Sequence, residues 1–208
     1  MAGLVLEGIV GSGKTSVIRH LKKYFYEKDC SSLILTEHLT ERPMEPLSSA
    51  NPANSVFHLD RLMNVIETLY NTKKSEPKNS FSNPYFVFER FHLSHCLDIA
   101  GFEQFNLYYS IDTRLNEHGA KLVVLSVPEN AIEERCIVST RRWRDIKWGN
   151  YLNSIAENDA GAAEYYKIQQ KRFFTLCQKS EIPSMVVDTS HSDWEEISFQ
   201  IVEFLNKS

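Results

Sequence analysis

The sequence predicts an α/β fold, in which helices flank a five-stranded parallel sheet. Five short apolar runs predict strands, and a segment with helical spacing of apolar residues follows each of them. This alternation is typical of a parallel sheet that is covered on both faces. Glycine or charged residues directly follow several predicted strands, and the carboxyl ends of parallel strands meet at one edge of a sheet. The sequence therefore predicts a functional site at that edge.

The first half of the chain contains two strands and two helices. The run Leu-Val-Leu at residues 4–6 predicts a buried strand, and apolar residues at helical spacing predict a helix over 17–28. The run SSLILT predicts a second strand at 31–36. Three prolines predict a loop over 40–53, and a long apolar face predicts a helix over 54–70.

The second half repeats this alternation. The polar segment 72–83 predicts a mobile connection, and YFVF predicts a third strand at 85–88. Helical spacing follows over 101–118, and KLVVLSV predicts a fourth strand at 121–127. The remaining predicted elements are helices at 128–145 and 159–180, a strand at 183–187 and a helix at 194–205.

Composition predicts one globular domain over residues 1–208. The net charge of −4 gives no support for a nucleic-acid or membrane partner, and no apolar run approaches the roughly 18 residues of a membrane span. The first predicted strand begins at the N-terminus, so no signal peptide is expected. Four widely spaced cysteines without a C-x-x-C motif predict reduced thiols in a cytoplasmic protein.

The turn after the first predicted strand contains a P-loop motif. Residues 3–16 read GLVLEGIVGSGKTS, with the spacing G-x-x-x-x-G-K-T. The glycines allow several N–H groups to converge on one anion, and the following helix adds its positive end. A glycine-rich turn without a ligand is the alternative, but a strand before the motif and a helix after it favour phosphate binding. The residues expected to bind ATP are Gly8, Gly11, Ser12, Gly13, Lys14, Thr15 and Ser16.

Two further strands end in charged residues. Glu37 follows the second strand, and Glu89 and Arg90 follow the third. A carboxylate at this position can bind Mg²⁺ or accept a proton, and a guanidinium can clamp a phosphate or carboxylate. A surface ion pair is the alternative interpretation. With the P-loop nearby, we expect Thr15 and Glu89 to bind Mg²⁺.

An arginine-rich segment follows the fourth strand. Arg135, Arg141, Arg142 and Arg144 lie within ten residues, and tryptophans stand at 143 and 148. Cations on a mobile segment stabilise the charge that spreads over a transferring phosphoryl group. A solvated helix face is the alternative. We expect a lid at about residues 135–155, with Arg141 and Arg142 as catalytic candidates.

Two other groups of residues receive structural interpretations. His92, His95 and Cys96 lie close in sequence, but a closed zinc site needs four nitrogen or sulfur ligands and no fourth ligand is evident. We therefore expect no metal there. Tyr165 and Tyr166 are expected to pack in the core and against the lid.

In order along the chain, these motifs resemble those of thymidylate kinases and of the related deoxynucleoside kinases. The resemblance spans nearly the whole chain, and Ser94 follows Arg90 by four residues, as in the D-R-x-x-x-S pattern of thymidylate kinases. It implies a P-loop kinase fold with ATP and Mg²⁺ as cofactors. It rests on EGIVGSGKT, Glu37, FHLDR at 57–61, ERF at 89–91, the arginine-rich segment and VVDTS at 186–190.

The resemblance implies an acceptor site on the helix over residues 54–70. In thymidylate kinases a Phe-x-x-x-Arg pair holds the nucleotide and the phenylalanine stacks on its base, and Phe57 and Arg61 have this spacing. Residues four apart share one face of a helix. The alternative is that Phe57 belongs to the core and that Arg61 pairs with Asp60 or Glu67.

The resemblance leaves two kinds of acceptor open. The Asp-Arg pair of thymidylate kinases binds Mg²⁺ and the acceptor phosphate, which implies these roles for Glu89 and Arg90. Val10 and this glutamate instead resemble deoxynucleoside kinases, which use a glutamate at the end of the second strand as base for the 5′-hydroxyl. This implies that Glu37 is the base and that the acceptor is a nucleoside.

The sequence therefore predicts an ATP-dependent kinase that acts on a nucleotide or nucleoside, and a homodimer is compatible with it. The alternatives are a kinase of another small molecule on the same scaffold and an ATP-binding regulatory module with slow turnover. The motifs N-K-x-D and D-x-x-G of GTPases do not occur.

Overall fold

The computed structural model describes residues 2–36, 51–74 and 84–207. The strands of this part of the chain form one parallel sheet with the order β2-β3-β1-β4-β5. The predicted α/β fold with five parallel strands is therefore confirmed. The strands are β1 (Ala2–Glu7), β2 (Ser32–Leu35), β3 (Tyr85–Glu89), β4 (Ala120–Ser126) and β5 (Ser184–Asp188).

The central strand β1 is buried on both faces. Leu4 and Leu6 pack into one hydrophobic cluster and Val5 packs into the other. All three are fully buried. This explains why the strand is continuously apolar, whereas a strand with one exposed face would alternate apolar and polar residues. In the pairing of β1 with β3, Leu6 lies opposite Glu89. The two strands therefore end at the same level.

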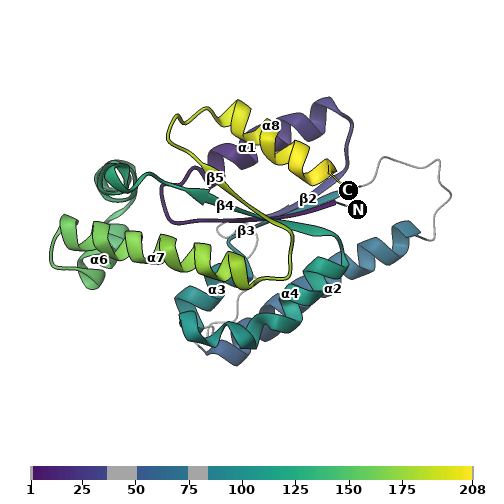
Figure 1. The fold of residues 1–208 in the computed structure, drawn as a ribbon, viewed down its shortest axis with the longest axis horizontal. Helices are drawn as coiled ribbons and strands as arrows, with labels where there is room; N and C mark the ends of the chain where they lie inside the picture. Colours follow the sequence, from purple (N-terminus) through teal and green to yellow (C-terminus); the bar gives the residue numbers. More distant parts are fainter. Residues whose placement is uncertain (1, 37–50, 75–83, 208) are drawn as a thin grey trace.

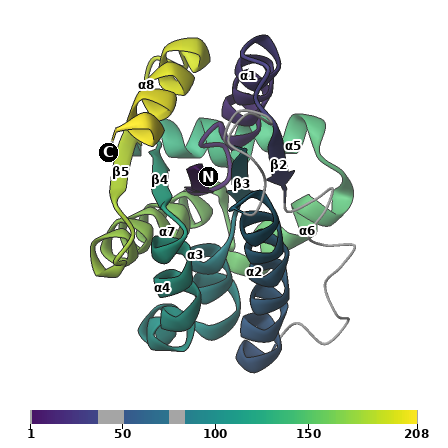
Figure 2. The same cartoon turned by 90° about the vertical axis from the view of Figure 1, so that its right-hand side faces the viewer.

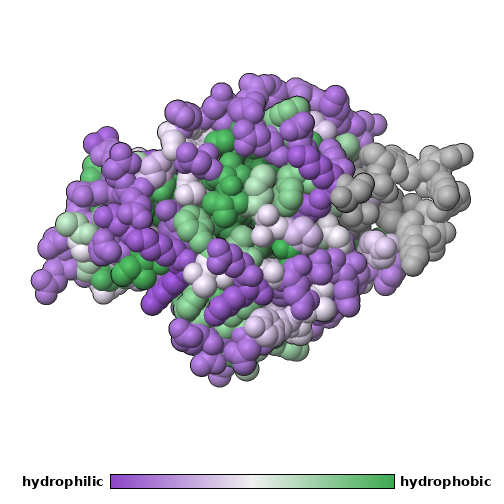
Figure 3. All heavy atoms as spheres, viewed as in Figure 1, coloured by the Kyte–Doolittle hydropathy of each residue, from purple (hydrophilic) through white to green (hydrophobic). Residues whose placement is uncertain are grey.

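Helices cover both faces of the sheet (Figure 1). α1 and α8 lie on one face, and α2, α4 and α7 lie on the other, an arrangement that is also visible from the side (Figure 2). The apolar residues visible in Figure 3 gather near the middle of the molecule, where the edge strand β5 passes between the two layers. The helices are α1 (Lys14–Glu27), α2 (Pro52–Lys74), α3 (His92–His95), α4 (Tyr109–Glu117), α5 (Ser139–Trp143), α6 (Ile146–Ile155), α7 (Asp159–Lys179) and α8 (Trp194–Asn206).

The predicted helix over 128–145 is wrong in detail. The chain forms a 3₁₀ turn (η5, Glu129–Ala131), a π-helical segment (η6, Glu133–Val138) and then the short α5. Arg144 adopts an extended conformation, which ends α5. Asp145 then begins α6 as an N-cap, because its side chain accepts a hydrogen bond from the backbone N–H of Trp148 at 3.2 Å.

The predicted helix over 101–118 also begins differently. A 3₁₀ segment (η4, Phe102–Tyr108) precedes α4, and a π-helical segment (η3, Cys96–Ala100) connects it to α3. These short segments escape prediction because each is too short to show a helical period.

The predicted long helix is α2, and it extends beyond both predicted ends. Pro52 is its first residue, a position that suits proline because a first-turn N–H has no acceptor within the helix. Ala53 and residues 72–74 are also helical, so the predicted loop and the predicted mobile connection are wrong at these positions. The rest of those two predictions, at residues 40–50 and 75–83, lies outside the described residues.

Arg114 joins α4 to α2. Its guanidinium donates hydrogen bonds to Asp60 Oδ1 at 2.5 Å, Glu67 Oε1 at 2.8 Å and Asn64 Oδ1 at 2.8 Å. The hydrogen bond and the charge of Arg114 lower the pKa of Glu67 despite its partial burial. One side chain thus holds two turns of α2 against α4.

We predict that Arg114→Ala lowers the free energy of unfolding by about 1–2 kcal/mol, because three charge-assisted or polar contacts are lost at a partly exposed position. Urea denaturation measures this difference. Arg172→Ala on the exposed face of α7 is the matched control and should change stability by less than about 0.5 kcal/mol. Equal effects of the two substitutions would contradict the assigned role.

Candidate active site

The P-loop connects β1 to α1 at the carboxyl edge of the sheet. Gly11 and Gly13 have φ angles of 75° and 96°, a region that favours glycine. A Cβ atom at Gly11 would lie 2.5 Å from the carbonyl oxygen of Arg135, and one at Gly13 would lie 2.2 Å from the ring of Trp194. Both glycines are therefore required by conformation and by close packing of neighbouring segments.

Lys14 is the first residue of α1, and its side chain folds back over the loop. Its Nζ donates hydrogen bonds to the carbonyl oxygens of Gly8 at 2.7 Å and Ile9 at 2.9 Å. Lys14 is only 7% exposed, so its side chain does not project into solvent in this conformation. The ammonium is nevertheless held within the turn where the motif predicts a phosphate.

The hydroxyl groups of the P-loop fit a ligand of high charge. Thr15 lies exposed at the start of α1, where a metal ion can reach its hydroxyl. The Ser12 hydroxyl is buried, and among the described residues it has no hydrogen-bond partner. Ser16 is partly buried in the first turn of α1. An unsatisfied buried hydroxyl beside a left-handed glycine turn is consistent with an anion site.

Arg90 follows β3 in a strained conformation. Its φ angle is 57°, which costs a non-glycine residue of order 1–3 kcal/mol. The backbone N–H of Arg90 donates to the carbonyl oxygen of Leu6 at 3.1 Å, and its guanidinium pairs with Asp98 at 2.6 Å. Glu89, the last residue of β3, is nearly buried beside it. The strand pairing thus places Glu89 and Arg90 next to the start of the P-loop, as predicted.

Glu7 is a site residue whose contacts the sequence did not reveal. It ends β1 directly before Gly8 and has 0% exposure. Its Oε1 accepts hydrogen bonds from the backbone N–H groups of Phe91 at 3.0 Å and Ser94 at 3.2 Å, and its Oε2 accepts one from the Ser94 hydroxyl at 2.5 Å. Burial raises the pKa of Glu7 despite these contacts. Glu7 is the last residue of an apolar strand and its partners are more than 80 residues away, so no local signal indicates this role.

Two tyrosines, one on α6 and one on α7, lie within electrostatic range of Arg90. Burial raises the pKa of Tyr151 on α6 and of Tyr166 on α7, while the nearby positive charge of Arg90 lowers both. Tyr166 belongs to the hydrophobic core, and Tyr165 packs against that core and meets Tyr166 edge to face. The expected core packing of the two tyrosines is therefore confirmed. α6 and α7 thus each bring a tyrosine within electrostatic range of Arg90.

The arginines of the predicted lid have separate partners. Arg141 pairs with Asp159 at 2.8 Å, and Arg142 lies 3.8 Å from Glu134. Arg144 lies over the Trp148 ring at 4.2 Å. Both Arg141 and Arg142 are largely exposed. A pocket of about 340 Å³ opens between α5 and α6, and it is lined by Arg141, Arg144, Asp145, Ile146, Gly149, Asn150 and Asn153.

Arg135 is packed beside the P-loop, because its carbonyl oxygen would lie 2.5 Å from a Cβ atom at Gly11. Its guanidinium donates to the carbonyl oxygen of Thr189 at 2.9 Å and lies 5.8 Å from the Trp194 ring centroid. Burial lowers the pKa of Arg135. The Sγ of the neighbouring Cys136 donates a hydrogen bond to the carbonyl oxygen of Val10, in the P-loop, at 2.9 Å. The base of the predicted lid is therefore packed directly against the loop.

Phe57 and Arg61 share an exposed face of α2, as their spacing predicts. Phe57 is 60% exposed, and the Arg61 guanidinium lies 6.0 Å from its ring centroid. The alternative that places Phe57 in the core is wrong. Asp60 and Glu67 pair with Arg114, as described above. Glu37, the predicted base, lies outside the described residues.

The histidines after β3 have protein partners. His92 Nε2 lies 2.9 Å from Asp112, and His95 Nδ1 lies 2.8 Å from the Ser55 hydroxyl. Cys96 is buried, and burial raises its pKa to about 12. Within residues 2–36, 51–74 and 84–207, no group of three or more histidine, cysteine or acidic side chains could hold a metal ion.

The turn after β4 is fixed by a side chain that the sequence did not single out. Gln170 on α7 accepts a hydrogen bond from the backbone N–H of Val127 at 2.7 Å and donates one to the carbonyl oxygen of Val127 at 2.8 Å. A side-chain amide suits such a two-way contact because it carries both a donor and an acceptor. Gln170 thus anchors α7 to the carboxyl edge of the sheet.

Comparison with known proteins supports the fold. No protein-family model matches the chain, and no curated protein sequence matches it. The crystal structure of the YorR protein from Bacillus subtilis in complex with phosphorylated GDP matches with a TM-score of 0.60 and 13% identity, over 98% of this chain and 95% of YorR. A deoxyadenosine kinase from M. mycoides with dCMP and dCDP bound gives a TM-score of 0.49 and 16% identity over 98% of both chains, which is too low to carry an argument.

At such low identity the likeness to YorR shows the fold alone. The chain shares with YorR an α/β fold, which here is a five-stranded parallel sheet flanked by helices. Among the helices of the described ranges, none is both long and apolar enough to span a membrane.

We predict that Glu7→Gln changes how stability depends on pH. Because burial raises the pKa of Glu7 above its usual 4.5, the folded chain retains this proton to a higher pH than the unfolded chain does. The wild type should therefore lose stability relative to Glu7→Gln as the pH rises above about 4.5. Urea unfolding of both proteins between about pH 4 and pH 8 measures the difference. A difference that stays constant with pH would contradict the raised pKa.

Proposed function

We propose that the chain is an ATP-dependent kinase that transfers the γ-phosphoryl group to a nucleotide or nucleoside. The observation that carries the proposal is the position of Arg90. Arg90 follows the strand that pairs with β1, and its N–H is bonded to Leu6, two residues before Gly8. This supports a role in which Lys14 and Arg90 would each supply a cation to a phosphoryl transfer. The fold of YorR, a protein whose structure holds phosphorylated GDP, supports this proposal.

The P-loop is the proposed donor site. Lys14 would exchange its loop carbonyl partners for the β and γ phosphates, and the loop N–H groups would bind the same anion. Thr15 and Glu89 would hold Mg²⁺, which neutralises phosphate charge when bound. Glu89 ends β3, and Thr15 lies in the first turn of α1, the helix that follows the strand paired with β3.

The acceptor site is proposed between α2 and the end of β3. Phe57 offers an exposed ring for a base, and Arg61 offers a cation on the same face. Arg90 would bind the acceptor after exchanging part of its contact with Asp98. Glu37 is proposed as the base that accepts the proton of a 5′-hydroxyl when the acceptor is a nucleoside.

The arginine-rich segment is proposed as the lid. Arg141 and Arg142 are exposed, and within the described part of the chain each takes part in one surface ion pair. Such pairs contribute about 0–1 kcal/mol, so these arginines can be redirected toward a phosphate at little cost. A single domain, a homodimer and a cytoplasmic location remain predictions of the same proposal.

The first test is acceptor-dependent ADP release, screened over nucleosides and nucleoside monophosphates. We expect Lys14→Ala to lower kcat by at least about 100-fold, because a cation that stabilises the transferring phosphoryl group is lost. Lys22→Ala, on the exposed face of α1, is the matched control and should retain wild-type turnover. ADP release that no acceptor stimulates would instead favour a slow ATP-binding module.

The acceptor face of α2 has its own test. We expect Phe57→Ala and Arg61→Ala each to lower kcat/KM for the best acceptor by about 10-fold or more while the KM for ATP stays nearly unchanged, since base stacking contributes roughly 1–3 kcal/mol. Val65→Ala, which truncates another exposed apolar residue of α2, is the control. Unaltered acceptor kinetics in both variants would exclude this face from the acceptor site.

A further inference from the structure

The carboxyl group of Glu7 is fully buried, although burial of a carboxyl group is unfavourable by itself. A carboxyl group at the end of a central apolar strand is unfavourable, and an apolar residue would suit the surrounding cluster better. Three hydrogen-bond donors nevertheless converge on it, and all three belong to the segment that follows β3. The interaction therefore joins the start of the P-loop to the segment that contains Arg90.

Two successive N–H groups, those of Arg90 and Phe91, donate hydrogen bonds to two successive residues of β1. Its own N–H donates to the carbonyl oxygen of Leu6, and the N–H of the next residue, Phe91, donates to the carboxyl group of Glu7. The Cα atom of Arg90 lies between these two N–H groups, and Arg90 has the left-handed φ angle of 57°. A strained backbone conformation persists only where its surroundings over-determine it. Here the contacts with β1 supply that constraint, and Ser94 strengthens it with two more hydrogen bonds.

The same residue borders the P-loop. Glu7 is bonded directly to Gly8, the first glycine of the motif. Because the Glu7 side chain holds the Arg90 turn and its backbone begins the loop, one residue fixes the relative position of the two. Reaction rates are sensitive to such distances, and a displacement of about 1 Å can cost about 100-fold.

We propose that Glu7 is a positioning residue whose carboxyl group, bound to Phe91 and Ser94, sets the turn at Arg90 and so holds the acceptor-binding arginine in register with the P-loop. The inference rests on the proposed function, because it assigns the acceptor to Arg90. It adds a residue that contacts neither substrate and acts only through Phe91 and Ser94, in the segment that follows β3 and includes α3.

The test compares Glu7→Ala, Glu7→Gln and Ser94→Ala with the wild type. Glu7→Ala should lower kcat/KM for the acceptor by about 100-fold and leave ATP affinity within about threefold. Glu7→Gln should restore activity to within about fivefold, because its amide oxygen can still accept both N–H groups and its NH₂ can meet the Ser94 oxygen. Ser94→Ala should fall between them, since it removes one of the three donors.

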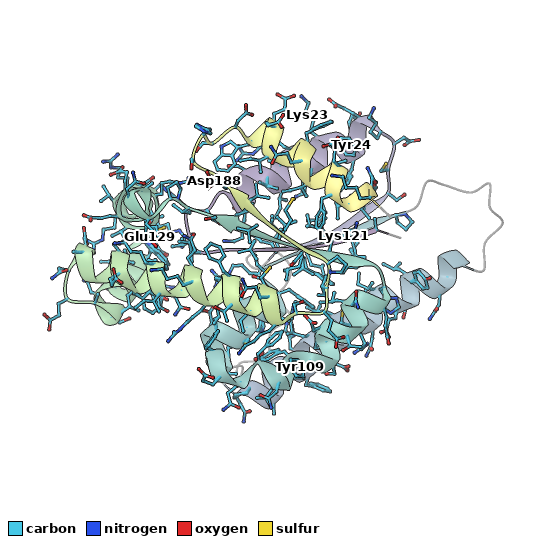
Figure 4. All side chains as sticks on the ribbon, in the orientation of Figure 1. Lys23, Tyr24, Tyr109, Lys121, Glu129 and Asp188 are labelled. Atoms are coloured by element: carbon cyan, nitrogen blue, oxygen red, sulfur yellow. The ribbon has the colours of Figure 1, made fainter. Side chains whose placement is uncertain are left out.

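Lys121→Met is the control for loss of stability alone. Lys121 lies near the start of β4, at the opposite edge of the sheet from Asp188 (Figure 4), and donates to carbonyl oxygens of Phe204 and Lys207 at the end of α8. Its loss should lower the Tm without changing acceptor kinetics. If Glu7→Ala shows the same pattern as Lys121→Met, Glu7 has only a structural role and the inference is wrong.

A crystal structure separates failure of this inference from failure of the proposed function. A wild-type protein that releases no acceptor-dependent ADP would refute the proposed function. The structure of Glu7→Ala, or of Ser94→Ala if Glu7→Ala does not fold, then decides the positioning role without any assay. A changed conformation at Arg90 supports the role, and an unchanged left-handed turn overturns it.

Discussion

The structure depends on the burial of β1 between two layers of helices. Because both faces of this strand are covered, its neighbours must be parallel strands whose connections cross the faces as helices. Parallel pairing then brings the ends of β1, β3 and β4 to one level. The P-loop, the Glu89–Arg90 pair and the turn at Val127 lie at this edge as a consequence. The site is therefore a product of the same packing that stabilises the sheet.

Much of this arrangement is predictable from the sequence because it rests on local patterns. The apolar runs predict all five strands of the described chain, and the spacing of Gly8, Gly13 and Lys14 locates the glycine turn between β1 and α1. The spacing of Phe57 and Arg61 correctly predicts that they share a face of α2. In each case the signal lies within one turn of a helix or one strand, so no knowledge of distant contacts is needed.

The remaining features depend on contacts between distant segments. Glu7 meets residues more than 80 positions away, and no local pattern distinguishes it from a strand-end acid that faces solvent. Gln170 binds Val127 from another layer. The predicted helix over 128–145 fails for a related reason. Its residues have helical spacing, but contacts with the P-loop and the cap at Asp145 divide it into short segments.

The contact between Gly11 and the η6 backbone has a consequence for the evolution of this chain. The α-carbon of Gly11 faces the carbonyl oxygen of Arg135, with no room between them for a side chain. A larger residue at position 11 would displace η6 and the arginines that follow it, as well as distort the loop. The atoms that exclude a side chain at position 11 belong to the backbone of a segment more than 120 residues away, so a different side chain at 135 or 136 would not make room for one. Related sequences should therefore keep glycine at this position.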